Sequence, residues 1–158
     1  HCINQCNISV HPVIFLKEQL DNKPSGTWIY PLALQRIMTS FNNFLLEKND
    51  IGILVLDSRG PIADDNLIAS YYSHTSKNPF GIACTNIIGP PFFARSHMTY
   101  GLQLAHHISH IVFGNYFDTY YSKKGGKDYM HMRPFWKKLA ENAIYGNINK
   151  LKGIIVWE

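Results

Sequence analysis

Residues 51–56 read Ile-Gly-Ile-Leu-Val-Leu, an unbroken apolar run of strand length, and Asp57 follows it directly. A strand without alternation of apolar and polar residues is typical of burial on both faces, in the middle of a sheet that helices cover. Open α/β sheets place their chemistry at the carboxyl ends of such strands. The run therefore predicts an α/β fold and makes Asp57 a candidate functional residue. The alternative is that Asp57 only begins a turn or caps the next helix.

Amphipathic patterns on both sides of this run predict helices. The apolar residues between Pro31 and Leu45 recur at the spacing of one helix face, and Pro31 suits the first turn. Asp64 and Asp65 introduce a second helix, and a third is expected after Pro134. Helices that interleave with strands are typical of the α/β class.

Three further segments have the composition of strands. Residues 7–16 are rich in apolar side chains, but Pro12 interrupts them, which favours an edge strand or two short pieces. Residues 82–88 and 154–157 are the other candidates. The segment 115–129 has weak periodicity and is expected to be a loop.

The composition bounds the class and the setting of the protein. A hydrophobic fraction of 46% and an aromatic fraction of 13% predict a folded chain, with residues 1–158 as one domain. No apolar run approaches a membrane span and no signal peptide is recognisable, so we expect a cytoplasmic protein without a membrane partner. The three cysteines fit neither a disulfide framework nor a zinc quartet, which favours reduced thiols.

The charge balance permits an anionic partner without requiring one. The chain has 15 basic and 11 acidic residues, a net charge of +4, and the basic residues are spread along it. Lys123 and Lys124 begin the only dense basic patch, in a Gly-rich loop. A solvated turn is one interpretation of this patch, and contact with a substrate phosphate is the other.

Residues 101–112 predict a helix that carries three histidines, His106, His107 and His110. His106 and His110 are four residues apart and therefore stack on one helix face, as in metal-binding helices. The metalloprotease pattern needs a Glu after the first histidine, so a zinc hydrolase is not favoured. A single histidine of this kind is more often an ordinary half-buried residue than a ligand.

Two other functional interpretations are weaker. Ser58 and Ser96 lack the Gly-x-Ser-x-Gly elbow of a Ser/His/Asp hydrolase. The pairs Tyr71-Tyr72 and Tyr120-Tyr121 are able to stack on bases, but paired aromatic residues more often serve packing or interfaces.

Asp57 and His106 together are candidates for a catalytic metal site. The first ends a central strand and the second lies early in a later helix, an arrangement that brings a carboxylate and an imidazole to one edge of a sheet. Such a pair is able to share a divalent metal that activates water. Since Mg²⁺ prefers carboxylate and phosphate oxygens, at least one more carboxylate is required.

Four blocks of the sequence together resemble the domain of unknown function 3800 family. They are Asp57-Ser58-Arg59, Gly89-Pro90-Pro91-Phe92, Arg95-Ser96 and Gly101-Leu102-Gln103-Leu104-Ala105. The resemblance extends from about Asn7 to the end of the histidine helix. It implies an RNase H-like fold, with a central sheet between flanking helices. It also implies a metal-dependent nuclease of a kind often linked to mobile elements or phage defence.

The same resemblance implies roles for individual residues. Asp57 and His106 match positions that hold Mg²⁺ or Mn²⁺. His110 is a further candidate ligand because of its four-residue spacing to His106, not because of the resemblance. Arg59 is then a catalytic contact to phosphate, and Ser96 and Gln103 orient the substrate. Imidazole suits softer ions than Mg²⁺, so His106 favours Mn²⁺ or Zn²⁺.

Two positions depart from the family pattern. The family motif Gln-Leu-Ala-Asp becomes Gln103-Leu104-Ala105-His106 here, although some RNase H-like nucleases use histidine at their last metal position. The family's opening Asp-Glu-Ser-Gly motif does not occur in residues 1–158. We therefore expect either that the family's N-terminal strands lie upstream of this chain or that this copy has lost catalysis.

These observations predict a metal-dependent nuclease-like protein that hydrolyses phosphodiester bonds of DNA or RNA. The alternative is a catalytically degenerate RNase H-like domain that binds nucleic acid or a protein partner, and a second copy of the chain is among the expected partners. A structural role in a larger assembly is the third possibility, favoured if Asp57 and His106 are far apart.

Overall fold

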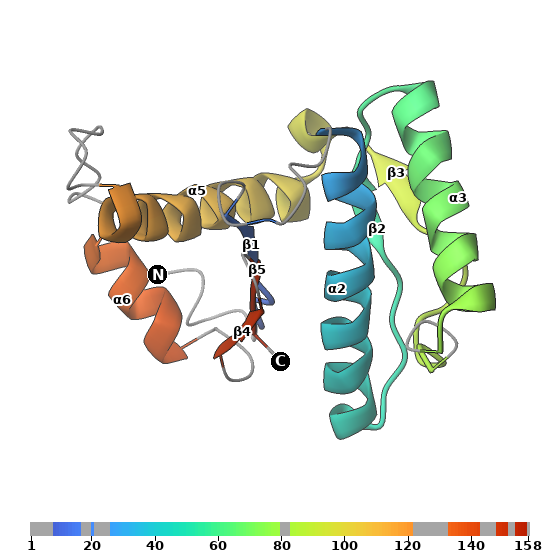
Figure 1. Cartoon of the computed structure of the whole chain (residues 1–158), viewed down its shortest axis with the longest axis horizontal. Helices are drawn as coiled ribbons and strands as arrows, with labels where there is room; N and C mark the ends of the chain where they lie inside the picture. The colour runs from blue at the N-terminus through green and yellow to red at the C-terminus, as the bar shows by residue number, and fades with distance from the viewer. Residues whose placement is uncertain are drawn as a thin grey trace.

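The computed structural model describes residues 8–16, 20, 26–79, 83–121, 133–142, 148–151 and 154–157, and they form a mixed α/β structure (Figure 1). In chain order the elements are β1 (Val13–Phe15), α2 (Gly26–Lys48), β2 (Val55–Asp57), α3 (Pro61–Lys77), β3 (Phe92–Ala94), the 3₁₀ turn η2 (Ser96–Met98), α5 (Tyr100–Tyr121), α6 (Arg133–Asn142), β4 (Ile148–Leu151) and β5 (Ile154–Trp157). The predicted α/β class is confirmed at this level.

The described strands form two separate sheets rather than the single central sheet that the sequence predicted. One sheet has the order β1-β5-β4, with antiparallel neighbours. The other is the parallel pair β2-β3, in which Val55 lies opposite Phe92 and Asp57 opposite Ala94. β1 lies at an edge, as the proline before it predicted, and the expected strand at 154–157 is β5.

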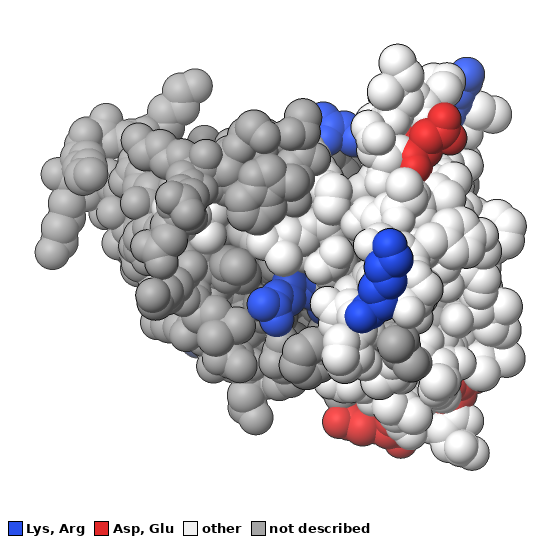
Figure 2. Space-filling view, turned by 45° about the vertical axis from the view of Figure 1, so that its right-hand side comes forward, with Lys and Arg blue, Asp and Glu red and all other residues white. Residues whose placement is uncertain are grey.

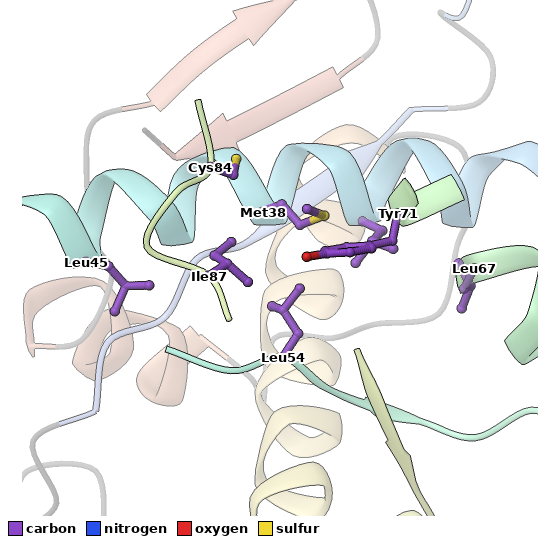
Figure 3. Packing of buried hydrophobic residues seen from close by; sticks show 8 residues of the cluster. Met38, Leu45, Leu54, Leu67, Tyr71, Cys84 and Ile87 are labelled. Atoms are coloured by element: carbon purple, nitrogen blue, oxygen red, sulfur yellow. The ribbon is translucent and has the colours of Figure 1, made fainter. Parts of the chain in front are cut away.

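The β2-β3 pair packs against α2 and α3 through the larger hydrophobic core (Figure 3). Leu34, Met38 and Leu45 of α2 are buried, as the helical spacing predicted. They meet a set of buried residues from the position before β2, from α3 and from the segment before β3: Leu54, Leu67, Tyr71, Cys84 and Ile87.

A second core joins α5 to α6 and to the segment around β1. Ile108 and Val112 of α5 pack with Val10 and with Leu139 of α6. Leu139 is only 1% exposed and Trp136 packs beside it, so the helix expected after Pro134 is present; Phe135, predicted for the same apolar side, is instead 58% exposed. The last two apolar residues predicted for that helix, at 143 and 144, lie outside the described residues.

Of the strand predicted at residues 51–56, only Val55 and Leu56 belong to β2, which extends to Asp57, and Gly52 makes an isolated bridge to Ile87. The apolar run is also buried on one face only, not on both. Leu54 is 7% exposed, whereas Ile51 and Ile53, on the other face, are 62% and 53% exposed. The reason is that α2 and α3 both contribute to the core on the Leu54 side. An unbroken apolar run predicts a strand buried on both faces, but it does not show whether the chain has an element to pack on each face.

The other predicted strand in this part of the chain is also wrong. Residues 83–88 form turns, with one isolated bridge from Ile87 to Gly52, and residue 82 lies outside the described residues. The strand that pairs with β2 is β3, after the Gly-Pro-Pro break. Since Pro90 and Pro91 have no N–H to donate to a ladder, regular pairing starts only beyond them.

Three helix boundaries also differ from the predictions. α2 begins at Gly26, so Pro31 lies inside the helix and not in its first turn. α3 begins at Pro61, where the missing N–H of proline has no cost, rather than at Asp64. α5 continues to Tyr121, so the loop expected from residue 115 is helical over 115–121, and residues 122–129 lie outside the described residues. No helix in the described ranges is both long and apolar enough to cross a bilayer.

Candidate functional site

The carboxyl ends of β2 and β3 bring together residues that are almost forty positions apart in the chain. The Ser58 N–H donates to the Ala94 carbonyl at 2.9 Å and continues the parallel ladder past Asp57. The Ser96 N–H donates to Oδ1 of Asp57 at 3.0 Å. The structure thus places two of the predicted site residues, Asp57 and Ser96, in direct contact.

Asp64 stabilises the loop that follows β2 by accepting two hydrogen bonds. Its Oδ2 accepts a hydrogen bond from the Ser58 hydroxyl at 2.6 Å, and its Oδ1 accepts one from the Arg59 N–H at 3.0 Å. Gly60, with φ of 100°, makes the turn that allows these contacts, in a conformation that suits glycine. The sequence predicted Asp64 only as the start of a helix, and nothing in it indicated these two hydrogen bonds.

An exposed arginine follows each of the two strands: Arg59 comes two residues after Asp57, and Arg95 follows β3. The Arg59 guanidinium lies over the ring of Tyr30 at 4.1 Å from its centroid, a cation–π contact that orients it. Arg95 comes directly after β3, next to Ser96. We call Asp57, Arg59, Arg95 and Ser96 the sheet-end site. The contribution of Tyr30 was not predicted, because it comes from a distant helix.

Figure 2 shows the charged side chains of the described residues on one face, where basic and acidic groups lie at several separate places. Lys123 and Lys124, predicted to contact substrate, lie outside the described residues.

The structure pairs His106 with His110 on α5. Their Nε2 atoms are 3.1 Å apart, and both side chains are exposed. His107 is also exposed, with its ring centroid 6.4 Å from that of His106. Gln103, the other predicted site residue on this helix, is half-buried, and its backbone N–H donates to the Thr99 carbonyl.

A groove of about 840 Å³ runs beside the histidine pair. His106 and His110 line one side, together with apolar residues of α5, and the segment 8–15 lines the other. That segment contributes His11, whose Nδ1 lies 2.9 Å from the Ser40 hydroxyl oxygen. Burial lowers the pKa of His11, so this ring tends to be neutral.

Cys84 lies in the larger core, away from the surface. It is 8% exposed, and burial raises the pKa of its thiol. Because cysteine reacts as its thiolate, this apolar setting disfavours nucleophilic chemistry at Cys84.

The predicted Mg²⁺ or Mn²⁺ ion can be tested against these donors. No group of three or more His, Cys, Asp or Glu side chains that could hold a metal occurs among the described residues. Mg²⁺ is, however, often bound through one or two carboxylates together with substrate phosphates. The exposed Asp57, with Oδ1 already fixed by Ser96, fits the part of one such carboxylate.

Comparisons with protein-family models, with curated proteins and with solved structures yield no match. The resemblance to the domain of unknown function 3800 family therefore stays a hypothesis, and a functional assignment has to be argued from the geometry of the sheet-end site.

Proposed function

We propose that this chain is an RNase H-like, metal-dependent nuclease that binds the phosphate backbone of DNA or RNA at the sheet-end site. The observation that carries this proposal is the hydrogen bond from the Ser96 N–H to Asp57, at the shared carboxyl end of two parallel strands. Ligands of open α/β sheets bind at such strand ends.

The chain's own residues have distinct tasks in this proposal. Arg59 and Arg95 bind phosphate oxygens through their guanidinium groups, and Tyr30 holds the first of them in place. Ser96 orients the Asp57 carboxylate through its backbone N–H, which leaves Oδ2 for an ion. A bound Mg²⁺ or Mn²⁺ would polarise the phosphodiester and lower the pKa of a water molecule.

Binding is tested by the salt dependence of affinity for a labelled oligonucleotide, measured by fluorescence anisotropy. We expect Arg59→Ala and Arg95→Ala each to reduce the slope of log K against log salt by roughly 0.7–0.9, the loss of about one phosphate contact. Lys77→Ala is the control, because Lys77 lies in the last turn of α3, whereas the loop after β2 leads into the first turn of that helix. Equal slopes in all four proteins would remove the sheet-end site from the interface.

Hydrolysis is tested separately, by cleavage of the same oligonucleotide in Mg²⁺ or Mn²⁺. We expect Asp57→Asn to abolish cleavage, because the neutral amide no longer attracts the ion, and to leave the fold intact. Asp65→Asn is the matched control, since Asp65 is an exposed carboxylate early in α3.

The alternative is a domain that binds nucleic acid without cutting it. One observation favours it: His106, the second metal ligand implied by the family resemblance, faces His110 with their Nε2 atoms 3.1 Å apart. Salt-dependent binding that needs the arginines, without cleavage in either metal, would select this alternative.

A further inference from the structure

His106 and His110 stand on successive turns of α5 with their ring nitrogens turned toward each other. The two Nε2 atoms are 3.1 Å apart, the ring centroids are 4.6 Å apart, and the ring planes are inclined by 84°. Binding of nucleic acid at the sheet-end site makes no use of this pair.

Two imidazole nitrogens that share one metal ion have this separation. With metal–nitrogen bonds of roughly 2.0–2.1 Å, adjacent ligand atoms lie about 3.3 Å apart in a tetrahedral site and about 2.9 Å apart at a right angle. A hydrogen bond between the rings also accounts for 3.1 Å, with one Nε2 protonated and the other not. The pair thus has a satisfied arrangement without metal, and the distance between its two nitrogens lies between those of the two chelate geometries.

The helix holds the pair in register. Ile108 lies between the two histidines and Val112 follows them, and they are 8% and 6% exposed in the core shared with α6. This packing fixes the backbone of the turn that carries both rings, so ordering it costs little when an ion binds. Both rings are exposed and line the groove, so an ion can reach them from solvent.

We propose that His106 and His110 form a bidentate site for a divalent transition-metal ion of the Zn²⁺, Ni²⁺ or Cu²⁺ class. Imidazole nitrogen suits these ions, whereas Mg²⁺ prefers oxygen ligands, so the site is chemically distinct from Asp57. Two side chains leave the remaining coordination positions to water or to a small donor in the groove.

The test is calorimetric titration of the whole chain with Ni²⁺ at neutral pH. Loss of an outer-shell partner alone lowers metal affinity by about 10–100-fold, so His106→Gln and His110→Gln should each lower it by about tenfold or more. The double variant should lose clearly less than the sum of the two single losses, because either single change already removes the chelate. His107→Gln, which changes an adjacent exposed histidine, should bind Ni²⁺ like the unmodified chain.

Three results would overturn the proposal. One is unchanged Ni²⁺ affinity in His106→Gln or His110→Gln, and another is an equal loss in His107→Gln. The third is additive losses in the double variant, which would mean that the two rings bind ions independently. Asp57→Asn should keep the site, so failure here and failure of the nuclease proposal are distinguishable.

Discussion

The sheet-end site and the histidine pair are both exposed and polar, but they are built over different ranges of the chain. In the sheet-end site, Asp57 meets Ser96 and Arg59 stacks on Tyr30, so three separated segments have to pack correctly. In the pair, His106 and His110 need only one helix and the spacing of four residues. We therefore expect mutations in the larger core to disturb the first site strongly and the second only weakly.

The largest change in stability is expected from Met38→Ala, in the core beneath the sheet-end site. Met38 is 0% exposed in the core that holds β2 against α2, so its truncation should lower the free energy of unfolding by about 2–5 kcal/mol. Met98→Ala is the control, because Met98 is 75% exposed and should change stability by about 0.5 kcal/mol or less. Urea denaturation measures both. Similar losses in the two variants would contradict the assigned core.

A smaller effect of opposite sign in the two regions is expected from glycine-to-alanine changes. A Cβ on Gly52 would lie 2.6 Å from Phe41 and 3.0 Å from Leu45, so Gly52→Ala should destabilise the chain by about 1–3 kcal/mol. At Gly101, early in α5, a Cβ meets nothing within 4 Å. Gly101→Ala should stabilise the chain by up to about 1 kcal/mol, since alanine favours helices. Thermal unfolding of both variants checks the two signs, and stabilisation by Gly52→Ala would show that this contact is not tight.

The smallest effect is a pH dependence that originates on the larger-core side. His74 is 4% exposed, and neither ring nitrogen has a partner among the described residues. Burial lowers its pKa from 6.5, and Arg36 lowers it further, so the unfolded chain binds this proton more readily than the folded chain. The contribution of His74 to the free energy of unfolding is therefore largest above about pH 6.5, the pKa in the unfolded chain. It falls as the pH drops from there through the folded pKa.

The slope of this loss is at most about 1.4 kcal/mol per pH unit for each proton taken up. His11 acts in the same direction, because burial lowers its pKa as well. We expect His74→Phe to remove part of the loss in unfolding free energy between pH 7 and pH 5. Urea denaturation at each pH measures this loss. His107→Phe makes the same change at an exposed histidine and should retain the full loss. An unaltered profile in His74→Phe would assign the titration to other groups.

The parts of the structure that the sequence predicted are those that depend on local periodicity. The buried face of α2, with Leu34, Met38 and Leu45, follows from helical spacing, and so does the stacking of His106 on His110. The position of Asp57 at the end of β2 follows from the apolar run before it.

The parts that the sequence did not predict depend on contacts between distant segments. The exposure of Ile51 and Ile53 results from which side of the segment 51–56 the two helices cover, and a run of apolar residues carries no information about that choice. Two further contacts likewise form only after α2, β2 and α3 have packed together. They are the hydrogen bond from Ser58 to Asp64 and the stacking of Arg59 on Tyr30. Local patterns locate a candidate residue, and tertiary packing decides what surrounds it.

The central claim is that Asp57 holds a catalytic ion beside a bound phosphate at the sheet-end site. It is tested most directly by anomalous diffraction from crystals of the chain soaked with Mn²⁺ and a short oligonucleotide. We predict an anomalous peak about 2.1–2.2 Å from a carboxylate oxygen of Asp57, the bond length of a small divalent cation to oxygen, with a phosphate oxygen completing the contact. An oligonucleotide bound elsewhere, or a peak only at His106 and His110 with none at Asp57, would contradict the claim.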